Sequence, residues 1–245
     1  MKILLAPSET KQSGGGAPFR LERLLFEALL PYRSKLLHTY TNIIQRGDIA
    51  ELSGMFGLKK EAEILKYKKD IVHEPAMKAV ERYTGVAFDY LDYPSLDQAA
   101  QQYVDSSVII FSNLFGPIRA NDMIPEYKLK QGAKVGDIRV DQYYKENSSD
   151  LMEAYLAKQD ILDLRAGFYD KFYKPSKPYT TLKFLKDGKV VSHWAKAYRG
   201  MVLRSVAEAN IETLDDFMKL TIPNLQIEDI QTKKNKTEVI YAITE

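Results

Sequence analysis

The sequence predicts an α/β protein with a mixed sheet, surrounding helices and a topology other than the Rossmann fold. Short runs rich in β-branched residues alternate with helical patterns, which is typical of parallel strands joined by helices. An Asp187-Gly188 pair between two alternating runs predicts a type I′ hairpin, and therefore antiparallel pairing as well. A sheet that contains both kinds of pairing is not a regular doubly wound sheet.

The expected strands are short runs enriched in Val, Ile, Thr and aromatic residues and bounded by turn-forming residues. They cover residues 2–6, 107–112, 160–164, 180–186, 189–194 and 237–243. The first of them begins directly after Met1, so the chain is expected to enter the sheet at once.

The N-terminal third is expected to be helical after its first strand. Apolar residues from Leu21 to Leu29 follow the i, i+3, i+4 spacing of an amphipathic helix. A second helix is expected after Pro31, with apolar residues as far as Ile44. Serine N-caps predict two later helices, 96–104 after Ser95 and 150–158 after Ser149.

A helical insertion follows these first helices. Asp48 and Glu51 have the spacing of an acidic capping box, so a short helix is expected to begin there and to end at Gly54 or Gly57. A lysine-rich helix is then expected from about Leu58.

The two glycines of this insertion, followed by Lys59 and Lys60, resemble a helix-hairpin-helix element. Such a turn offers backbone amides to a DNA phosphate, with the lysine side chains alongside. Gly54 and Gly57 are separated by two residues rather than one, so an ordinary corner between two helices is the alternative.

The composition predicts one globular cytosolic domain that spans residues 1–245. Hydrophobic residues make up 45% of the chain, enough for a stable core, and no cysteine is present to form a disulfide or a thiolate metal site. No apolar run approaches the roughly 18 to 20 residues that a membrane helix requires, and the run after Met1 is too short for a signal peptide. Nothing in the sequence indicates an oligomeric state.

The loop after the first strand is a candidate anion or catalytic site. Ser8, Glu9 and Lys11 follow the strand, and three glycines precede the next helix. Loops at the carboxyl ends of strands form ligand sites in open α/β sheets, and amides beside a lysine suit an anion. A flexible connector stabilised by local turn bonds is the alternative.

A second candidate follows the strand at 107–112. Arg119 could hold a phosphate or carboxylate, and Lys128 adds a further positive charge. Asp122 could orient the arginine, act as a base or cap a turn. The alternative is an internal Arg-Asp pair that fixes the loop.

A third candidate is the start of the helix after Trp194. Lys196 and Arg199 are three residues apart near its N-terminus, an unfavourable place for two cations unless an anion binds there. A solvated basic face is the alternative. The three histidines are widely scattered and no metal-ligand spacing surrounds them, so neither a metal site nor a cofactor is indicated: His38, His73 and His193.

Four blocks of sequence together are similar to the YaaA family of peroxide stress proteins. They occur in the order of that family and span nearly the whole chain: ILLAPSETK, Tyr83-Thr84-Gly85, SNLFGPIRANDMIPEYKL and AKAYRG.

The resemblance implies an unusual α/β fold with a helix-hairpin-helix element. It also implies a cytosolic protein, induced by hydrogen peroxide, that limits free intracellular iron and binds duplex DNA in a positively charged cleft. The residues that the matching blocks carry over are Lys11, Tyr83, Arg119, Asp122, Tyr127, Lys196, Arg199 and Gly200.

Two departures set this chain apart from many family members. The run from Asp163 to Ala166 replaces Asn-Leu-Ala-Ser, and Phe168-Tyr169 replaces a Glu-Tyr pair. The opening PSETK also differs from the more common SPAKT form. These departures indicate a divergent branch.

Three functions follow from these features. The first is binding of duplex DNA without strong sequence preference, through the basic clusters and the glycine turn. The second is an enzyme that acts on a small anionic or nucleotide-like substrate in a pocket around Lys11, Arg119, Asp122 and Lys196. The third is an adaptor whose basic faces bind an acidic protein. A compact pocket would favour the enzyme, and a long open groove would favour DNA.

Overall fold

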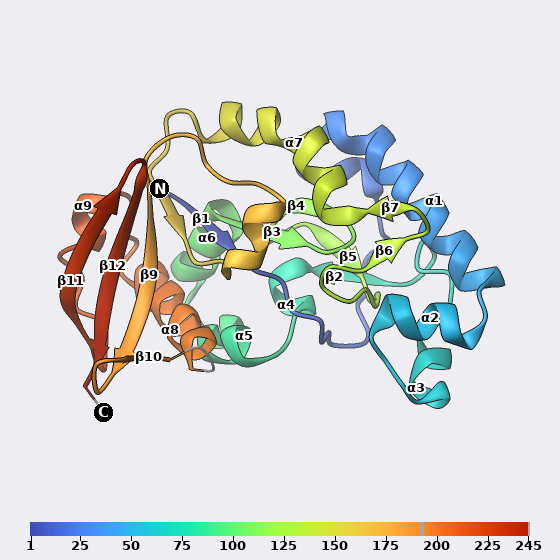
Figure 1. The fold of residues 1–245 in the computed structure, drawn as a ribbon, viewed down its shortest axis with the longest axis horizontal. Coiled ribbons are helices and arrows are strands. Elements are labelled where there is room, and N and C mark those ends of the chain that lie inside the picture. The colour runs from blue at the N-terminus through green and yellow to red at the C-terminus, as the bar shows by residue number, and fades with distance from the viewer. Residues whose placement is uncertain (192–193, 245) are drawn as a thin grey trace.

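The computed structural model describes residues 1–191 and 194–244 and confirms a mixed α/β fold. Its main sheet has the strand order β11-β12-β9-β8-β1-β3-β4, and β10 pairs with β9 (Figure 1). These strands are β1 (Lys2–Leu5), β3 (Val108–Ser112), β4 (Gly116–Arg119), β8 (Ile161–Asp163), β9 (Tyr179–Lys186), β10 (Lys189–Val190), β11 (Leu225–Lys233) and β12 (Lys236–Ile243). Two small ribbons pair β2 (Ala76–Lys78) with β5 (Met123–Pro125) and β6 (Lys134–Val135) with β7 (Ile138–Arg139).

Strand β1 lies inside the sheet and pairs in parallel on both sides. Ile3 is opposite Val108 of β3, and Lys2 is opposite Ile161 of β8. Ile3 and Leu4 are completely buried, as expected for a parallel strand that is covered on both faces. Because β1, β3 and β8 run in the same direction, their carboxyl ends meet at one edge of the sheet.

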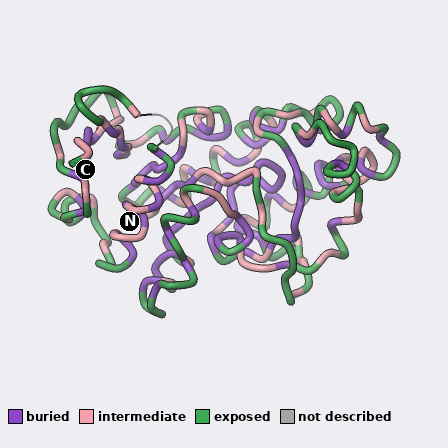
Figure 2. Tube along the Cα trace, turned by 90° about the horizontal axis from the view of Figure 1, so that it is seen from below, coloured by how far each residue is buried: buried purple, intermediate pink, exposed green. Residues whose placement is uncertain are grey.

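The helices enclose this sheet, with α7 along the top of Figure 1 and α5 and α8 along the bottom. The helices are α1 (Leu30–Arg46), α2 (Ile49–Phe56), α3 (Glu61–Lys66), α4 (Ala79–Arg82), α5 (Val86–Leu91), α6 (Gln98–Ser107), α7 (Val140–Leu156), α8 (Ala195–Glu208) and α9 (Leu214–Phe217). Figure 2 shows the buried residues mainly in the interior of the molecule and the exposed ones mainly at its periphery. No helix of the described residues is long and apolar enough to cross a membrane.

Most of the expected strands are present, and the Asp187-Gly188 hairpin is confirmed. Both turn residues have positive φ, 52° and 72°, as a type I′ turn requires. The strand expected at 189–194 is shorter, since β10 ends at Val190 and residues 192–193 lie outside the described part of the chain. Strand β11 was not expected from the sequence.

The prediction of a helix from Leu21 to Leu29 is wrong. Two short 3-10 turns, Leu21–Arg23 and Glu27–Leu29, take its place. The interruption has a clear cause, because the backbone N–H of Leu25 donates to the Asp122 carboxylate at 2.8 Å instead of to a helical carbonyl.

The expected helix caps are partly correct. Asp48 caps α2 by accepting from the Glu51 N–H, and the helix ends at Gly57, which has a left-handed φ of 69°. The other two caps are wrong. Asp97, not Ser95, caps α6. Ser149 lies inside α7, where its hydroxyl donates to the Lys145 carbonyl, and that helix begins at Val140.

Two buried arginines hold the loops around the sheet. The Arg33 guanidinium donates to the carbonyls of four residues. Two of them are Phe115, directly before β4, and Pro117, inside β4. The Arg82 guanidinium likewise donates to carbonyls at Gln12, Gly14, Pro75 and Ile124. Each arginine therefore joins segments that are far apart in the sequence, since a guanidinium offers five donors in a fixed plane.

Gly116 offers a test of the packing at the end of β3. Its φ is +69°, and a Cβ would collide with the Tyr144 ring. Gly188 has a similar φ of +72°, but no atom lies within 4 Å of its Cβ position. Gly188→Ala should therefore lower the free energy of unfolding by about 1–2 kcal/mol through backbone strain alone. Gly116→Ala should lower the free energy of unfolding by about 1–3 kcal/mol more than Gly188→Ala does, because the added methyl group overpacks against the Tyr144 ring. Urea denaturation measures both values, and equal losses would contradict the proposed steric role of Tyr144.

Candidate functional site

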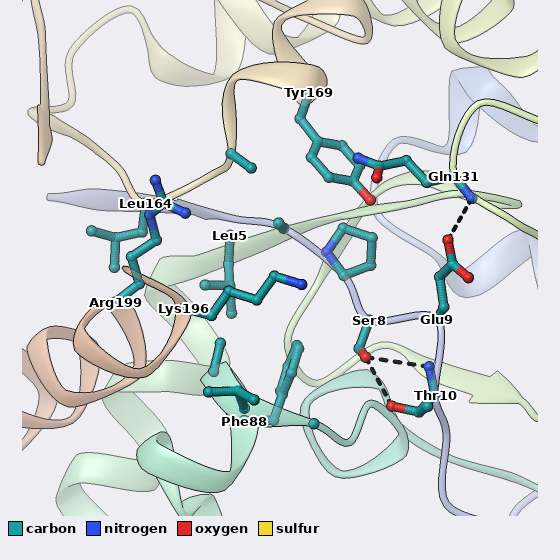
Figure 3. A pocket seen from close by; sticks show the side chains of 16 residues that line it. Leu5, Ser8, Glu9, Thr10, Phe88, Gln131, Leu164, Tyr169, Lys196 and Arg199 are labelled. Carbon is teal, nitrogen blue, oxygen red and sulfur yellow. Dashed lines mark hydrogen bonds between the residues drawn. The ribbon is translucent and has the colours of Figure 1, made fainter. Parts of the chain in front are cut away.

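A cavity of about 460 Å³ opens at the carboxyl ends of β1 and β8 (Figure 3). This volume is within the range of about 300–1,000 Å³ that is typical of small-molecule sites. Its walls are the segment after β1, the first turn of α5, the segment after β8 and the first turns of α8. The cavity therefore has the location that was expected for a ligand site in an open α/β sheet.

One wall is the segment from Ser8 to Thr10, which is held against Gly85. The Ser8 hydroxyl accepts from the Thr10 N–H at 3.2 Å, and the Thr10 hydroxyl donates to the Thr84 carbonyl at 3.0 Å. Gly85 has a φ of +104°, and a Cβ there would lie only 3.1 Å from the Ser8 oxygen and 3.2 Å from the Thr10 oxygen. A glycine at this position therefore lets the two segments meet.

Glu9 is fixed at one end of the cavity. One carboxylate oxygen accepts from the Gln131 N–H at 2.9 Å, and the other lies 3.8 Å from the Lys128 ammonium. Lys128 also donates to the Glu9 carbonyl at 3.2 Å. The Glu9 side chain keeps 42% of its surface exposed, so it can still accept a hydrogen bond from a ligand.

Lys196 and Arg199 line the other end of the cavity, and they come from α8. Figure 3 shows the Lys196 side chain pointing into the cavity and Arg199 lying beside Leu164. Gly200 sets the position of this helix, because a Cβ there would collide with the Ala87 carbonyl of α5. The close approach of α5 and α8 places both cations over the ends of the strands.

Arg199 is a half-buried cation without an ion-pair partner among the described residues. Burial lowers the pKa of its guanidinium, and attraction to Asp163 only partly opposes this effect. Both oxygens of Asp163 already accept from the Arg165 guanidinium, at 2.9 and 2.7 Å. No carboxylate in the described part of the chain forms a salt bridge with Lys196 either. Such a pair of cations is suited to hold an anion.

Lys11 lies behind the Ser8–Thr10 wall and is not part of the cavity lining. Its ammonium donates to the Ser8 carbonyl at 3.2 Å and lies 4.0 Å from the centre of the Tyr127 ring. Burial, together with the nearby Lys128 charge, lowers the pKa of Lys11 to about 7. The hydroxyl group of Tyr127 lies 2.9 Å from the hydroxyl of Tyr83 and 2.9 Å from the hydroxyl of Ser112, so the three groups form a hydrogen-bonded chain.

Arg119 and Asp122 do not line this cavity. The chain turns back after β3, so β4 is antiparallel and Arg119 is opposite Ile109, near the start of β3. Asp122 accepts from the backbone N–H groups of Leu25 and Arg119, and its other oxygen lies 3.7 Å from the Arg119 guanidinium. The expected pocket that would join these two residues to Lys11 and Lys196 is therefore not formed.

The residues of the glycine turn lie elsewhere in the molecule. Figure 1 places α2 and α3 at the far end from α8. Gly54 is inside α2, whereas Gly57 forms the turn that follows it. Lys59 and Lys60 are exposed beside this turn. Lys66 and Lys69, by contrast, each lie 3.6 Å from the buried Glu126 carboxylate.

Three polar or aromatic residues line the cavity but were not among the site residues predicted from the sequence. Phe88, Gln131 and Tyr169 come from separate segments and carry no motif that marks them. Tyr169 belongs to the first departure noted above, and its hydroxyl donates to the Asn113 side chain at 3.1 Å. Within the described residues, no group of three or more His, Asp and Glu side chains is placed to hold a metal ion.

Comparison with known proteins agrees with the resemblance seen in the sequence. A protein of Campylobacter jejuni, described as uncharacterized, is 43% identical over 99% of both chains. A UPF0246 protein of Streptomyces coelicolor is 32% identical over 84% of this chain and 82% of its own length. A UPF0246 protein of Corynebacterium glutamicum is 33% identical over 90% of this chain and 91% of its own.

The sequence profile of one family matches residues 1–231, which is most of the chain. That family is described as peroxide stress protein YaaA, and its description supports a role in the response to oxidative stress. Both the profile and the relatives lead to the assignment that the four sequence blocks predicted. The chain belongs to the peroxide stress protein YaaA family.

Proposed function

We propose that the chain binds a small anionic ligand in the cavity at the ends of β1 and β8. The observation that carries the proposal is the pair Lys196 and Arg199, which line the cavity and form no salt bridge with a carboxylate among the described residues. A half-buried guanidinium without an ion-pair partner costs free energy, and a bound phosphate or carboxylate would offset that cost.

The cavity also contains groups that would act on such a ligand. Ser8 and Glu9 line it opposite the cations, so a hydroxyl and a carboxylate are available to a bound substrate. Lys11 donates to the Ser8 carbonyl from behind, and its pKa of about 7 suits a group that exchanges a proton near neutral pH. Asp122 is outside this set. The proposed activity is therefore that of an enzyme on a small anion, with Ser8 and Glu9 as the catalytic candidates.

A second proposal is the one that the family resemblance implies: binding of duplex DNA without strong sequence preference, in a cytosolic stress response that limits free intracellular iron. It is favoured by the exposed Lys59 and Lys60 beside the Gly57 turn. Among the described residues Lys60 forms one salt bridge, with Glu63 at 3.6 Å on the surface, so a phosphate can displace that partner.

The anion site is tested with pyrophosphate by isothermal titration calorimetry. Charge-assisted hydrogen bonds are worth about 1.5–3 kcal/mol, so Arg199→Gln should weaken binding about tenfold or more. Lys196→Gln should weaken it in the same direction. Lys219→Gln, on the exposed surface beside α9, is the control and should bind like the wild type. If the wild type does not bind pyrophosphate, the proposed anion site is refuted.

The charge state of Lys11 is tested by the pH dependence of stability. Because its pKa is lowered to about 7, the unfolded chain binds more protons than the folded chain above that pH. The cost of burying the ammonium is complete below pH 7 and is relieved as the pH rises. The free energy of unfolding of the wild type, minus that of Lys11→Met, should therefore increase between pH 7 and 10. The slope can reach at most about 1.4 kcal/mol per pH unit.

Urea denaturation of both proteins at several pH values gives this difference directly. Groups that do not interact with Lys11 cancel in the comparison, so the difference reports Lys11 and its coupling to the nearby Lys128. A flat difference between pH 7 and 10 would show that Lys11 stays charged in the folded protein.

DNA binding is tested by fluorescence anisotropy of a labelled duplex from about 50 to 200 mM salt. Lys59→Ala/Lys60→Ala should weaken binding and lower the salt slope by about 0.9 for each lost phosphate contact. Lys158→Ala/Lys219→Ala removes the same charge from the exposed surface elsewhere and should have a smaller effect. No binding by the wild type at 50 mM salt would refute the proposal, and an equal effect of both variants would refute the role of the glycine turn.

A further inference from the structure

The cavity is chemically different at its two ends. Lys196 and Arg199 provide positive charge at one end, while Glu9 and the side chain of Gln131 lie at the other (Figure 3). The ends are therefore matched to a ligand that carries an anion at one side and a hydrogen-bond donor at the opposite side.

Between these ends the walls are apolar and include two aromatic rings. Figure 3 shows Tyr169 on one side of the cavity and Phe88 on the other. Leu5 and Leu164 add aliphatic surface from the ends of β1 and β8. Such walls favour a flat ring in the middle of the ligand, whereas a sugar without a base would leave its hydroxyl groups facing carbon.

The aromatic wall is also held in place. The Tyr169 hydroxyl is committed to Asn113, and its ring lies 5.5 Å from that of Phe172. The Phe88 ring lies 5.5 Å from that of Tyr83. Both rings are therefore positioned before a ligand binds, which lowers the entropic cost of ordering the site.

Resting on the proposed function, we propose that the anionic ligand is a nucleoside monophosphate whose base carries an exocyclic amino group. The phosphate binds Lys196 and Arg199, and the base lies between Phe88 and Tyr169. The amino group donates to Glu9, whose exposed carboxylate is an acceptor at that end. Ser8 and Thr10 line the wall along which the ribose lies.

Isothermal titration calorimetry with four probes tests each part of this assignment. AMP should bind at least tenfold more tightly than adenosine, which lacks the phosphate, and than ribose 5-phosphate, which lacks the base. AMP should also bind several-fold more tightly than IMP, which has no exocyclic amino group to donate.

Variants locate each contact. Arg199→Gln should reduce the affinity for AMP toward that for adenosine. Glu9→Gln keeps the acceptor for the Gln131 N–H but removes the charge, so it should reduce the preference for AMP over IMP. Lys219→Gln should bind all four probes like the wild type, and circular dichroism spectra confirm that each variant is folded.

The outcomes separate this assignment from the proposed anion site. If ribose 5-phosphate binds as tightly as AMP and Arg199→Gln weakens both, the anion site stands and the nucleoside assignment is wrong. If AMP and IMP bind equally, the role of Glu9 is wrong. If none of the probes binds and pyrophosphate does not bind, the anion site itself is refuted.

Discussion

The double parallel pairing of β1 is the constraint on which the rest of the structure depends. Its neighbours β3 and β8 come from distant parts of the chain, yet all three strands must end at the same edge of the sheet. That edge receives the Ser8–Thr10 segment, the segment after β8 and the start of α8. The contact of Gly200 with α5 then closes the cavity, because a larger residue would hold α8 away from the sheet. The site is thus a product of strand direction and of one close helix contact.

Much of the fold was accessible from the sequence because its inner strands are β-branched and its turns carry glycine at positive φ. Strand β11 was missed because it lies at the sheet edge, where Glu228, Asp229 and Gln231 are exposed. Its apolar alternation covers only Leu225 to Glu228 and stops at the bulge between Ile227 and Asp229, so the pattern is too short to predict a nine-residue strand. At the site, Glu9 could be predicted because it follows the first strand, and Arg199 because two cations near the start of a helix suit an anion. Arg119 could not be placed, because nothing local shows that the chain reverses after β3.

The basic residues of the chain occupy two distinct physical settings. The lysines around α2 and α3 are largely on the surface, and some are already neutralised by Glu126. The cations of α8 line a cavity with largely apolar walls, in which Arg199 is half-buried and Lys196 stays exposed. A lower local dielectric makes electrostatic interactions at Arg199 stronger than at a free surface. A near-neutral total charge of +2 hides this difference. Charge at a cavity and charge on a surface support different kinds of binding, and one chain contains both.

The position of β12 has a consequence for how the protein is made. This strand is synthesised after every other described strand of the sheet, yet it lies between β9 and β11 rather than at an edge. While the ribosome is still translating the segment between them, β9 has an open side with unsatisfied backbone groups. A nascent chain in that state resembles an aggregation-prone edge strand. A chaperone that covers β9 until β12 is made would protect it.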